Sequence, residues 1–344
     1  MKVSELGEFG LIDVLSQIVS QGEADPRIMV GPGDDAAAWR TDAATLLATT
    51  DTLVQGVHFT AESTWWEVGW KALAVNLSDI AAMGGVPQYA LVSLSLPGDT
   101  EVDDVAQLCQ GMTELANQFR VAIVGGNVSG GPVVAVTLTV IGQAQADGVL
   151  TRSAAVPGDL IAVTGYPGSS AAGLRMLTHH LQLATDAMAF LRRAHLQPVP
   201  RIAEGQLLVK GEVRAAIDIS DGLIADLGHL CQASKVGAVI KAEQVPIHPI
   251  VRAAFPEDSL DFALAGGEDY ELLFTASEKV IGSVRASFDA SGHGADCPVT
   301  VIGEITRERE LTLVDEEGRP FRGDGKGWDH FRKGGQSAEN PGSC

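Results

Sequence analysis

The chain has 344 residues, of which 45% are hydrophobic and 20% are charged, so its length predicts two domains with enough apolar material for a core. Its formal net charge of −20 argues against nucleic-acid binding, which needs a basic face. The negative charge does not exclude a small phosphate ligand, because backbone N–H groups, a few arginines and a divalent metal ion can together hold an anion.

Hydrophobic periodicity predicts helices and strands in the first half of the chain. Helices are expected over 4–20, 65–84 and 101–118. Strands are expected over 45–54, 89–96, 121–126 and 133–144. The helix over 65–84 is apolar on nearly all sides and the last two strands are strongly apolar, so we expect all three to be buried.

Turn-forming residues over 151–158 indicate a domain boundary, after which helices and strands mix again. Helices are expected over 171–177 and 221–234, and strands over 160–165, 215–220, 236–240, 269–276 and 299–305. Without strict βαβ alternation, this mixture predicts an α+β fold. We place one domain at 1–150, a second at 151–331 and a polar, disordered tail at 332–344.

Motifs for targeting and for the common nucleotide folds are absent from the sequence. The N-terminal residues do not resemble a signal peptide, and the longest apolar stretch, 133–142, is too short to span a membrane. The four cysteines lack metal-ligand spacing, which favours reduced thiols and a cytoplasmic, non-membrane protein. Neither a Walker P-loop, a G-x-G-x-x-G turn nor a protein-kinase signature occurs.

Five aspartates lie beside small or apolar residues rather than among other polar ones: Asp34, Asp51, Asp79, Asp218 and Asp221. A buried carboxylate must be paired or must coordinate a metal ion, and basic residues are sparse nearby. Oxygen ligands without His or Cys favour Mg²⁺ or Mn²⁺, and several Mg²⁺ ions usually accompany phosphates. Asp79 is the strongest single candidate for a metal ligand, because aspartate is unfavourable inside a buried helix.

Simpler roles compete at several positions. Asp221 is equally suited to cap the helix that follows it, and Asp35 to hold a turn. An isolated histidine such as His58 is more commonly a core residue, and Arg152 is either a surface charge or a phosphate clamp. Asn127 lies in a predicted glycine-rich loop that forms either an anion-binding nest or a tight hairpin.

Eight motifs, in order, resemble the thiamine-monophosphate kinase family: GPGDDAA, TTDTLVQGVHF, KALAVNLSDIAAMGGVP, VGGN, PGDLIAVTG, IDISDGLIADL, LAGGEDYELLFT and GWDHF. This family belongs to a wider group with aminoimidazole ribotide synthetase, selenophosphate synthetase and a hydrogenase-maturation dehydratase. The resemblance implies ATP- and Mg²⁺-dependent phosphorylation of thiamine monophosphate to thiamine diphosphate. It also implies a homodimer, whose N-terminal domains complete a β-barrel with flanking helices, and a C-terminal α/β sandwich domain.

The resemblance also implies roles for individual residues. The implied metal ligands are Asp34, Thr49, Thr50, Asp51, Asp79, Asn127, Asp218 and Asp221. The implied ATP contacts are Gly126, Asn127, Arg152 and Ser220, and the implied substrate contacts are His58, Glu268 and Trp328. The family usually has aspartate where this chain has Asn127, so one metal position lacks a charge. Direct in-line transfer is expected, with no catalytic nucleophile or general base.

Two alternatives are weighed against this interpretation. The terminal Cys344 favours a relative that activates a carbonyl or thiocarbamate oxygen, because the hydrogenase-maturation enzymes use a C-terminal cysteine. The uncharged Asn127 favours a weakened nucleotide-binding or sensor protein. Neither has a second supporting motif, whereas all five aspartates support the kinase.

Overall fold

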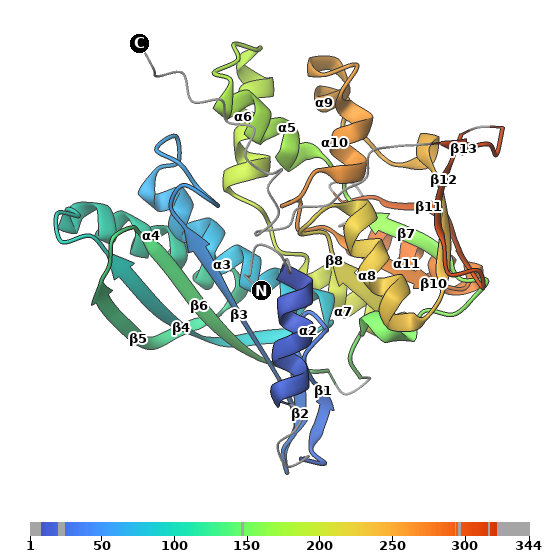
Figure 1. Ribbon diagram of the computed structural model, residues 1–344, viewed down its shortest axis with the longest axis horizontal. Coiled ribbons are helices and arrows are strands. Elements are labelled where there is room, and N and C mark those ends of the chain that lie inside the picture. The colour runs from blue at the N-terminus through green and yellow to red at the C-terminus, as the bar shows by residue number, and fades with distance from the viewer. Residues whose placement is uncertain are drawn as a thin grey trace.

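The computed structural model describes residues 8–19, 25–145, 148–292, 294, 297–315 and 317–321. Two β-sheets with their own helices occupy separate halves of the molecule (Figure 1), which confirms the predicted α+β class. The predicted domain limits at residues 150 and 331 stay predictions. The tail at 332–344, with Cys344, lies outside the described residues, as does Trp328.

The first sheet has six strands in the order β1-β2-β3-β6-β4-β5. Their bounds are β1 (Ile28–Val30), β2 (Ala37–Arg40), β3 (Thr45–Val54), β4 (Val86–Leu96), β5 (Ala122–Gly130) and β6 (Ala135–Gln143). The helices of this half are α2 (Glu8–Val19), α3 (Trp65–Ala82) and α4 (Val102–Phe119). All pairs are antiparallel except β4–β5, which is parallel.

Strand β5 was predicted to be buried, and this prediction was wrong. Every residue of β5 is exposed, whereas β6 alternates between buried and half-buried residues. The reason is position in the sheet: β5 forms one edge and pairs, within the described residues, with β4 alone. Apolar composition indicates a strand, but it does not tell a central strand from an edge strand.

The second sheet has seven strands in the order β13-β12-β9-β11-β7-β10-β8. Their bounds are β7 (Leu160–Thr164), β8 (Ala215–Asp218), β9 (Gly237–Lys241), β10 (Leu272–Ala276), β11 (Val299–Thr306), β12 (Leu311–Val314) and β13 (Pro320–Phe321). The helices are α5 (Ser169–Thr178), α6 (Thr185–Leu196), α7 (Ile202–Lys210), α8 (Leu223–Ser234), α9 (Pro249–Ala254), α10 (Ser259–Ala265) and α11 (Glu278–Ser291). Short 3₁₀ turns occupy Arg152–Ala154 and Ala242–Gln244.

The strand predicted from residue 269 begins only at Leu272. Glu268 and Tyr270 have φ angles of 65° and 53°, which interrupt the extended backbone. The chain therefore makes an irregular turn just before β10, and this turn carries one of the candidate substrate residues.

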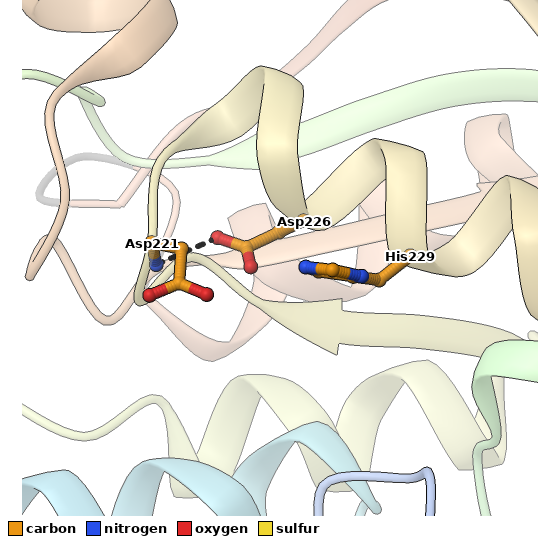
Figure 2. Close-up of side chains that lie close together, drawn as sticks. All are labelled: Asp221, Asp226 and His229. Carbon is orange, nitrogen blue, oxygen red and sulfur yellow. Dashed lines mark hydrogen bonds between the residues drawn. The ribbon is translucent and has the colours of Figure 1, made fainter. Parts of the chain in front are cut away.

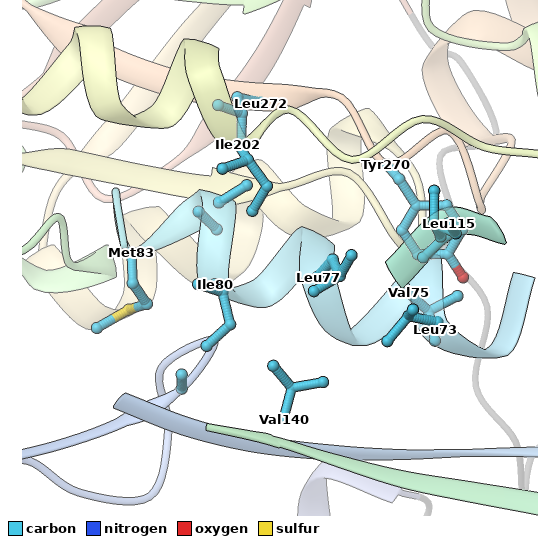
Figure 3. Close-up of a cluster of buried hydrophobic side chains, with 14 of the residues drawn as sticks. Leu73, Val75, Leu77, Ile80, Met83, Leu115, Val140, Ile202, Tyr270 and Leu272 are labelled. Atoms are coloured by element: carbon cyan, nitrogen blue, oxygen red, sulfur yellow. The ribbon is translucent and has the colours of Figure 1, made fainter. Parts of the chain in front are cut away.

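Helix α3 holds the two halves together. Thr64 and Glu67 form a capping box that starts the helix, and nearly all of its residues are buried. Figure 3 shows its apolar side chains between Val140 of β6 on one side and Ile202 and Leu272 of the second half on the other. Each such side chain contributes roughly 1.5–3 kcal/mol, so α3 is a rigid support for residues at the junction.

Two glycines allow α3 and α4 to cross at close range. A Cβ atom at Gly69 would lie 1.9 Å from the carbonyl oxygen of Leu108, and one at Gly111 would lie 1.9 Å from that of Trp66. Any larger residue would push the helices apart. No helix in the described part of the chain has the length and apolar character needed to cross a membrane.

Candidate active site

Three carboxylates from distant parts of the sequence meet at the junction of the two halves. Asp35 lies just before β2, Asp79 lies near the end of α3 and Asp218 is the last residue of β8. Each places a carboxylate oxygen within 4.8 Å of the other two. Only tertiary structure brings them together, because Asp79 and Asp218 are 139 positions apart in the sequence.

Burial and mutual repulsion raise the pKa of two members of this cluster well above the usual range. For Asp79 the largest cause is burial, followed by the charge of Asp51, and for Asp218 it is burial, followed by the charge of Asp35. Hydroxyl donors oppose these effects: Ser78 donates to Asp218 at 2.6 Å, and Thr49 donates to Asp79. The cluster is therefore short of positive charge, as the sequence predicts for Asp79.

Arg152 is the cation beside this cluster. Its Nη2 lies 2.5 Å from Oδ1 of Asp35, and its backbone N–H donates to Oδ2 of Asp34 at 3.1 Å. The side chain of Arg152 is only 20% exposed and is paired with a fully buried carboxylate, so the interpretation as a surface charge was wrong. Burial and the charge of Asp35 raise the pKa of Asp34 to about 6.

A second group lies at the start of α8, where Asp221, Asp226 and His229 come together (Figure 2). Oδ2 of Asp226 accepts the backbone N–H groups of Ser220, Asp221 and Gly222, each at 3.0 Å. The helix N-cap is Gly222, which has no side chain to cap with, so capping by Asp221 was wrong. Asp226, in the first turn of the helix, accepts the three backbone N–H groups that precede it, and the Asp221 carboxylate does not cap the helix.

Strand β3 divides its candidate ligands between two faces of the first sheet. Thr49 and Asp51 are two residues apart and share the face that packs on α3, where Thr49 contacts Asp79. Thr50 points to the opposite face, and its hydroxyl donates to the carbonyl oxygen of Leu138 at 2.8 Å. The structure thus places Thr49 and Asp51 with the aspartate cluster, and it places Thr50 on the other side.

Asn127 shares the face of Thr50. It is paired in register with Ser93 of β4, which is paired with Thr137 of β6, and paired residues point to the same side of a sheet. The predicted glycine-rich loop was wrong, because β5 runs through this stretch without a break. Gly126 permits the close pairing, since a Cβ atom there would lie 1.7 Å from the carbonyl oxygen of Val92.

Two of the three candidate substrate residues meet around a buried lysine. Nζ of Lys71, on α3, lies 2.6 Å from Oε1 of Glu268 and donates to the carbonyl oxygen of His58 at 3.4 Å. Burial would raise the pKa of Glu268, but the charge of Lys71 outweighs this effect and the pKa is lowered, so Glu268 stays ionised. Nδ1 of His58 accepts the backbone N–H of Val54 at 3.0 Å, which fixes its ring.

Sequence reasoning missed three polar residues of this region, Lys71, Asp226 and Ser78, and left the role of a fourth undecided. Lys71 carried a signal, because a lone lysine in a buried helix needs a partner. Asp226 carried another, since acidic side chains in a first helical turn favour exposed N–H groups. Ser78 carried no signal, and the sequence left Asp35 open between holding a turn and touching a metal ion.

The donor set suits a hard divalent cation. The clustered groups around Asp79 offer carboxylate and hydroxyl oxygens, and the described residues of this cluster include no thiol and no imidazole. Such ligands favour Mg²⁺ or Mn²⁺ over zinc or copper.

Comparison with models of protein families shows the broad family of the chain. Residues 33–144 match the family model of the AIR synthase related protein N-terminal domain, and residues 156–316 match that of its C-terminal domain. The two matches cover most of the chain, which is thus an AIR synthase related protein.

Closer relatives narrow the class. The thiamine-monophosphate kinase of Escherichia coli (strain K12) is 41% identical over 328 residues, covering 94% of this chain and 98% of that protein. The one from Bacillus subtilis (strain 168) is 35% identical, covering 93% and 99%. The structure of AaThiL complexed with AMPPCP and TMP has a TM-score of 0.83 and 33% identity, covering 96% and 99%. The chain therefore belongs to the thiamine-monophosphate kinase family.

Proposed function

We propose that this chain transfers the γ-phosphoryl group of ATP to thiamine monophosphate and releases thiamine diphosphate and ADP. The observation that carries the proposal is the cluster of Asp35, Asp79 and Asp218 beside Arg152, in a chain similar over nearly its full length to thiamine-monophosphate kinases. Two polyanions must approach each other in this reaction, and an acidic junction needs cations to allow it.

Magnesium is the cation that this donor set favours. Asp51, Asp79 and Asp218 would hold it on the α3 side of the first sheet, with Asp34 and Asp221 at the margins. When bound, Mg²⁺ neutralises phosphate charge and fixes the orientation of the phosphate oxygens.

The reaction is an in-line displacement. An oxygen of the thiamine monophosphate phosphate forms a bond to the γ-phosphorus, and the bond from that phosphorus to the β-phosphate oxygen breaks. The attacking phosphate has its second pKa near 6 and is already ionised, so no general base is required. Arg152 and Ser220 would bind the phosphates of ATP, and His58 and Glu268 would orient the acceptor.

A homodimer completes the proposal. Strand β5 is an exposed edge strand, and its side chains Ile123, Val124 and Val128 are exposed although apolar. Tyr89 and Leu91 of β4 are exposed beside it. A second copy of the chain that covers this surface would bury it and would close over Asn127 and Thr50.

A coupled assay for ADP release tests the activity. With ATP and Mg²⁺, we expect turnover with thiamine monophosphate and little with thiamine or aminoimidazole ribonucleotide precursors. Binding of ATP and thiamine monophosphate without ADP release would contradict the kinase and favour a sensor protein.

A further inference from the structure

We propose that Lys71 is a positioning residue for the acceptor substrate, whose buried ammonium group holds His58 of the first half and Glu268 of the second half in one fixed arrangement. This inference rests on the proposed function, in which these two residues orient thiamine monophosphate. It assigns a role to a lysine that the sequence analysis did not place in the site.

A single nitrogen atom joins the two candidate substrate residues. Nζ of Lys71 lies 2.6 Å from Oε1 of Glu268 and donates to the backbone carbonyl oxygen of His58 at 3.4 Å. The lysine side chain is 1% exposed and comes from α3, the helix that packs between the two halves. Because a buried side chain on a packed helix has little freedom to move, Lys71 determines where both partners lie.

Glu268 needs such a support because its backbone is strained. Its φ angle of 65° lies in the left-handed region, which residues other than glycine rarely adopt. Its N–H donates to the carbonyl oxygen of Ser220 at 2.7 Å, which fixes the backbone just after β8. A strained conformation persists only where several contacts hold it, and such conformations are common in ligand-binding sites. Lys71 supplies the side-chain contact and directs the carboxylate toward α3.

The second oxygen of the Glu268 carboxylate faces α6. Nδ1 of His195 lies 3.5 Å from this Oε2 and 3.0 Å from Oγ of Ser170. The side chain of Glu268 nevertheless keeps 25% of its surface exposed. Lys71 and His195 therefore leave an accessible part of the carboxylate in a defined orientation, which is what a substrate contact requires.

A purely structural ion pair is the competing explanation, and α3 offers such a pair for comparison. Glu67, one turn earlier on the same helix, is 5% exposed and is paired with Arg192 of α6 at 2.6 Å. Both pairs connect α3 to the second half through a buried charge. The Lys71 pair includes a candidate substrate residue, and the Glu67 pair does not. Arg192→Met is therefore a matched control for Lys71→Met.

Calorimetric titration of the full chain with thiamine monophosphate, in the presence of Mg²⁺ and the ATP analogue AMPPCP, tests the inference. We expect Lys71→Met to raise the Kd for thiamine monophosphate about tenfold, as loss of one well-placed charged contact usually does. Its Kd for AMPPCP alone should stay within about twofold of wild type, because groups without a shared contact are nearly independent. Arg192→Met should leave both constants unchanged although it lowers the melting temperature.

Equal weakening of thiamine monophosphate binding in Lys71→Met and Arg192→Met would overturn the inference, because any loosening of α3 would then suffice. An unchanged Kd in Lys71→Met would overturn it, and so would an equal rise in the Kd for AMPPCP. Thermal melting verifies folding, and Lys71→Gln, whose amide keeps a donor but no charge, is a second variant with the same expected loss. ADP release by wild type is measured separately: its absence would contradict the proposed kinase, whereas the ratios of Kd require no turnover.

Discussion

The hydroxyl of Ser78, on α3, donates a hydrogen bond of 2.6 Å to the carboxylate of Asp218, at the end of β8. The two residues belong to different halves of the molecule, and the bond is buried. It ties the helix that carries Asp79 to the strand that carries Asp218, so the spacing of these carboxylates depends on how the halves pack.

Removing the charge of Asp218 should abolish activity without unfolding the chain. We expect Asp218→Asn to lower kcat by about 10²-fold or more, the usual cost of losing one preorganised charge-stabilising group. The melting temperature should stay equal or rise, because a repelling carboxylate is removed. ADP release and thermal melting check both expectations. Near-normal turnover would refute the metal role of Asp218, and Asp159→Asn is the control.

The stability of the metal-free protein should fall as pH rises from about 6.5 to about 8.5. Burial raises the pKa of Asp269 from 3.8 to about 8, so this stabilising proton is fully present below 3.8 and is lost as pH rises through 8. Burial lowers the pKa of His195 from 6.5 to about 3. Below about pH 6.5 this group therefore makes stability rise with pH and opposes the effect of Asp269. Melting temperatures in EDTA measure the trend. If the melting temperature of Asp269→Asn fell with pH as steeply as that of wild type, the proton on Asp269 would not be the cause.

The ion pair of Lys71 and Glu268 should show unequal costs on its two sides. Lys71 is 1% exposed and Glu268 is 25% exposed. Glu268→Gln leaves the deeper charge unpaired and should lower the free energy of unfolding by about 3 kcal/mol, whereas Lys71→Met should cost about half as much. Urea unfolding measures both, and the double variant should recover part of the loss. An equal loss of unfolding free energy in the two single variants would show that the deeper burial of Lys71 does not determine the cost.

Asp226 should act through its oxygen rather than its charge. Asp226→Asn keeps an acceptor for three backbone N–H groups and should stay within about 1 kcal/mol of wild type, whereas Asp226→Leu should lose about 3 kcal/mol. The Leu variant should also raise the KM for ATP, because Ser220 and Asp221 lose their support. Urea unfolding and initial rates test this. An equal loss in both variants would make the charge responsible.

Charges on the β5 edge should prevent dimerisation. We expect the double variant Val124→Lys, Val128→Lys to behave as a 36.0 kDa monomer in light scattering, while wild type has about twice that mass. Both valines are exposed, at 58% and 69%, so the fold should survive. Val156→Lys, another exposed valine, is the control. A dimer that persists in the double variant would place the interface elsewhere.

Local chemistry in the sequence determined much of this protein by itself. The period of apolar residues gave the strand at 45–54 with its observed limits and the helix at 65–84 within two residues at its end. The apolar surroundings of Asp79 and Asp218 predicted an uncompensated acidic site. These inferences succeed because periodicity and the cost of a buried charge are properties of short segments.

Tertiary packing decided the rest. Whether β5 is central or an edge, and which face Asn127 occupies, depends on strand order, which no short segment contains. Asp34 and Asp35 contact different atoms of Arg152, which lies more than one hundred residues away along the chain: Asp34 accepts its backbone N–H, and Asp35 pairs with its guanidinium. Adjacent residues with identical side chains are equivalent in sequence, and only the different atoms that they meet in the folded chain separate them.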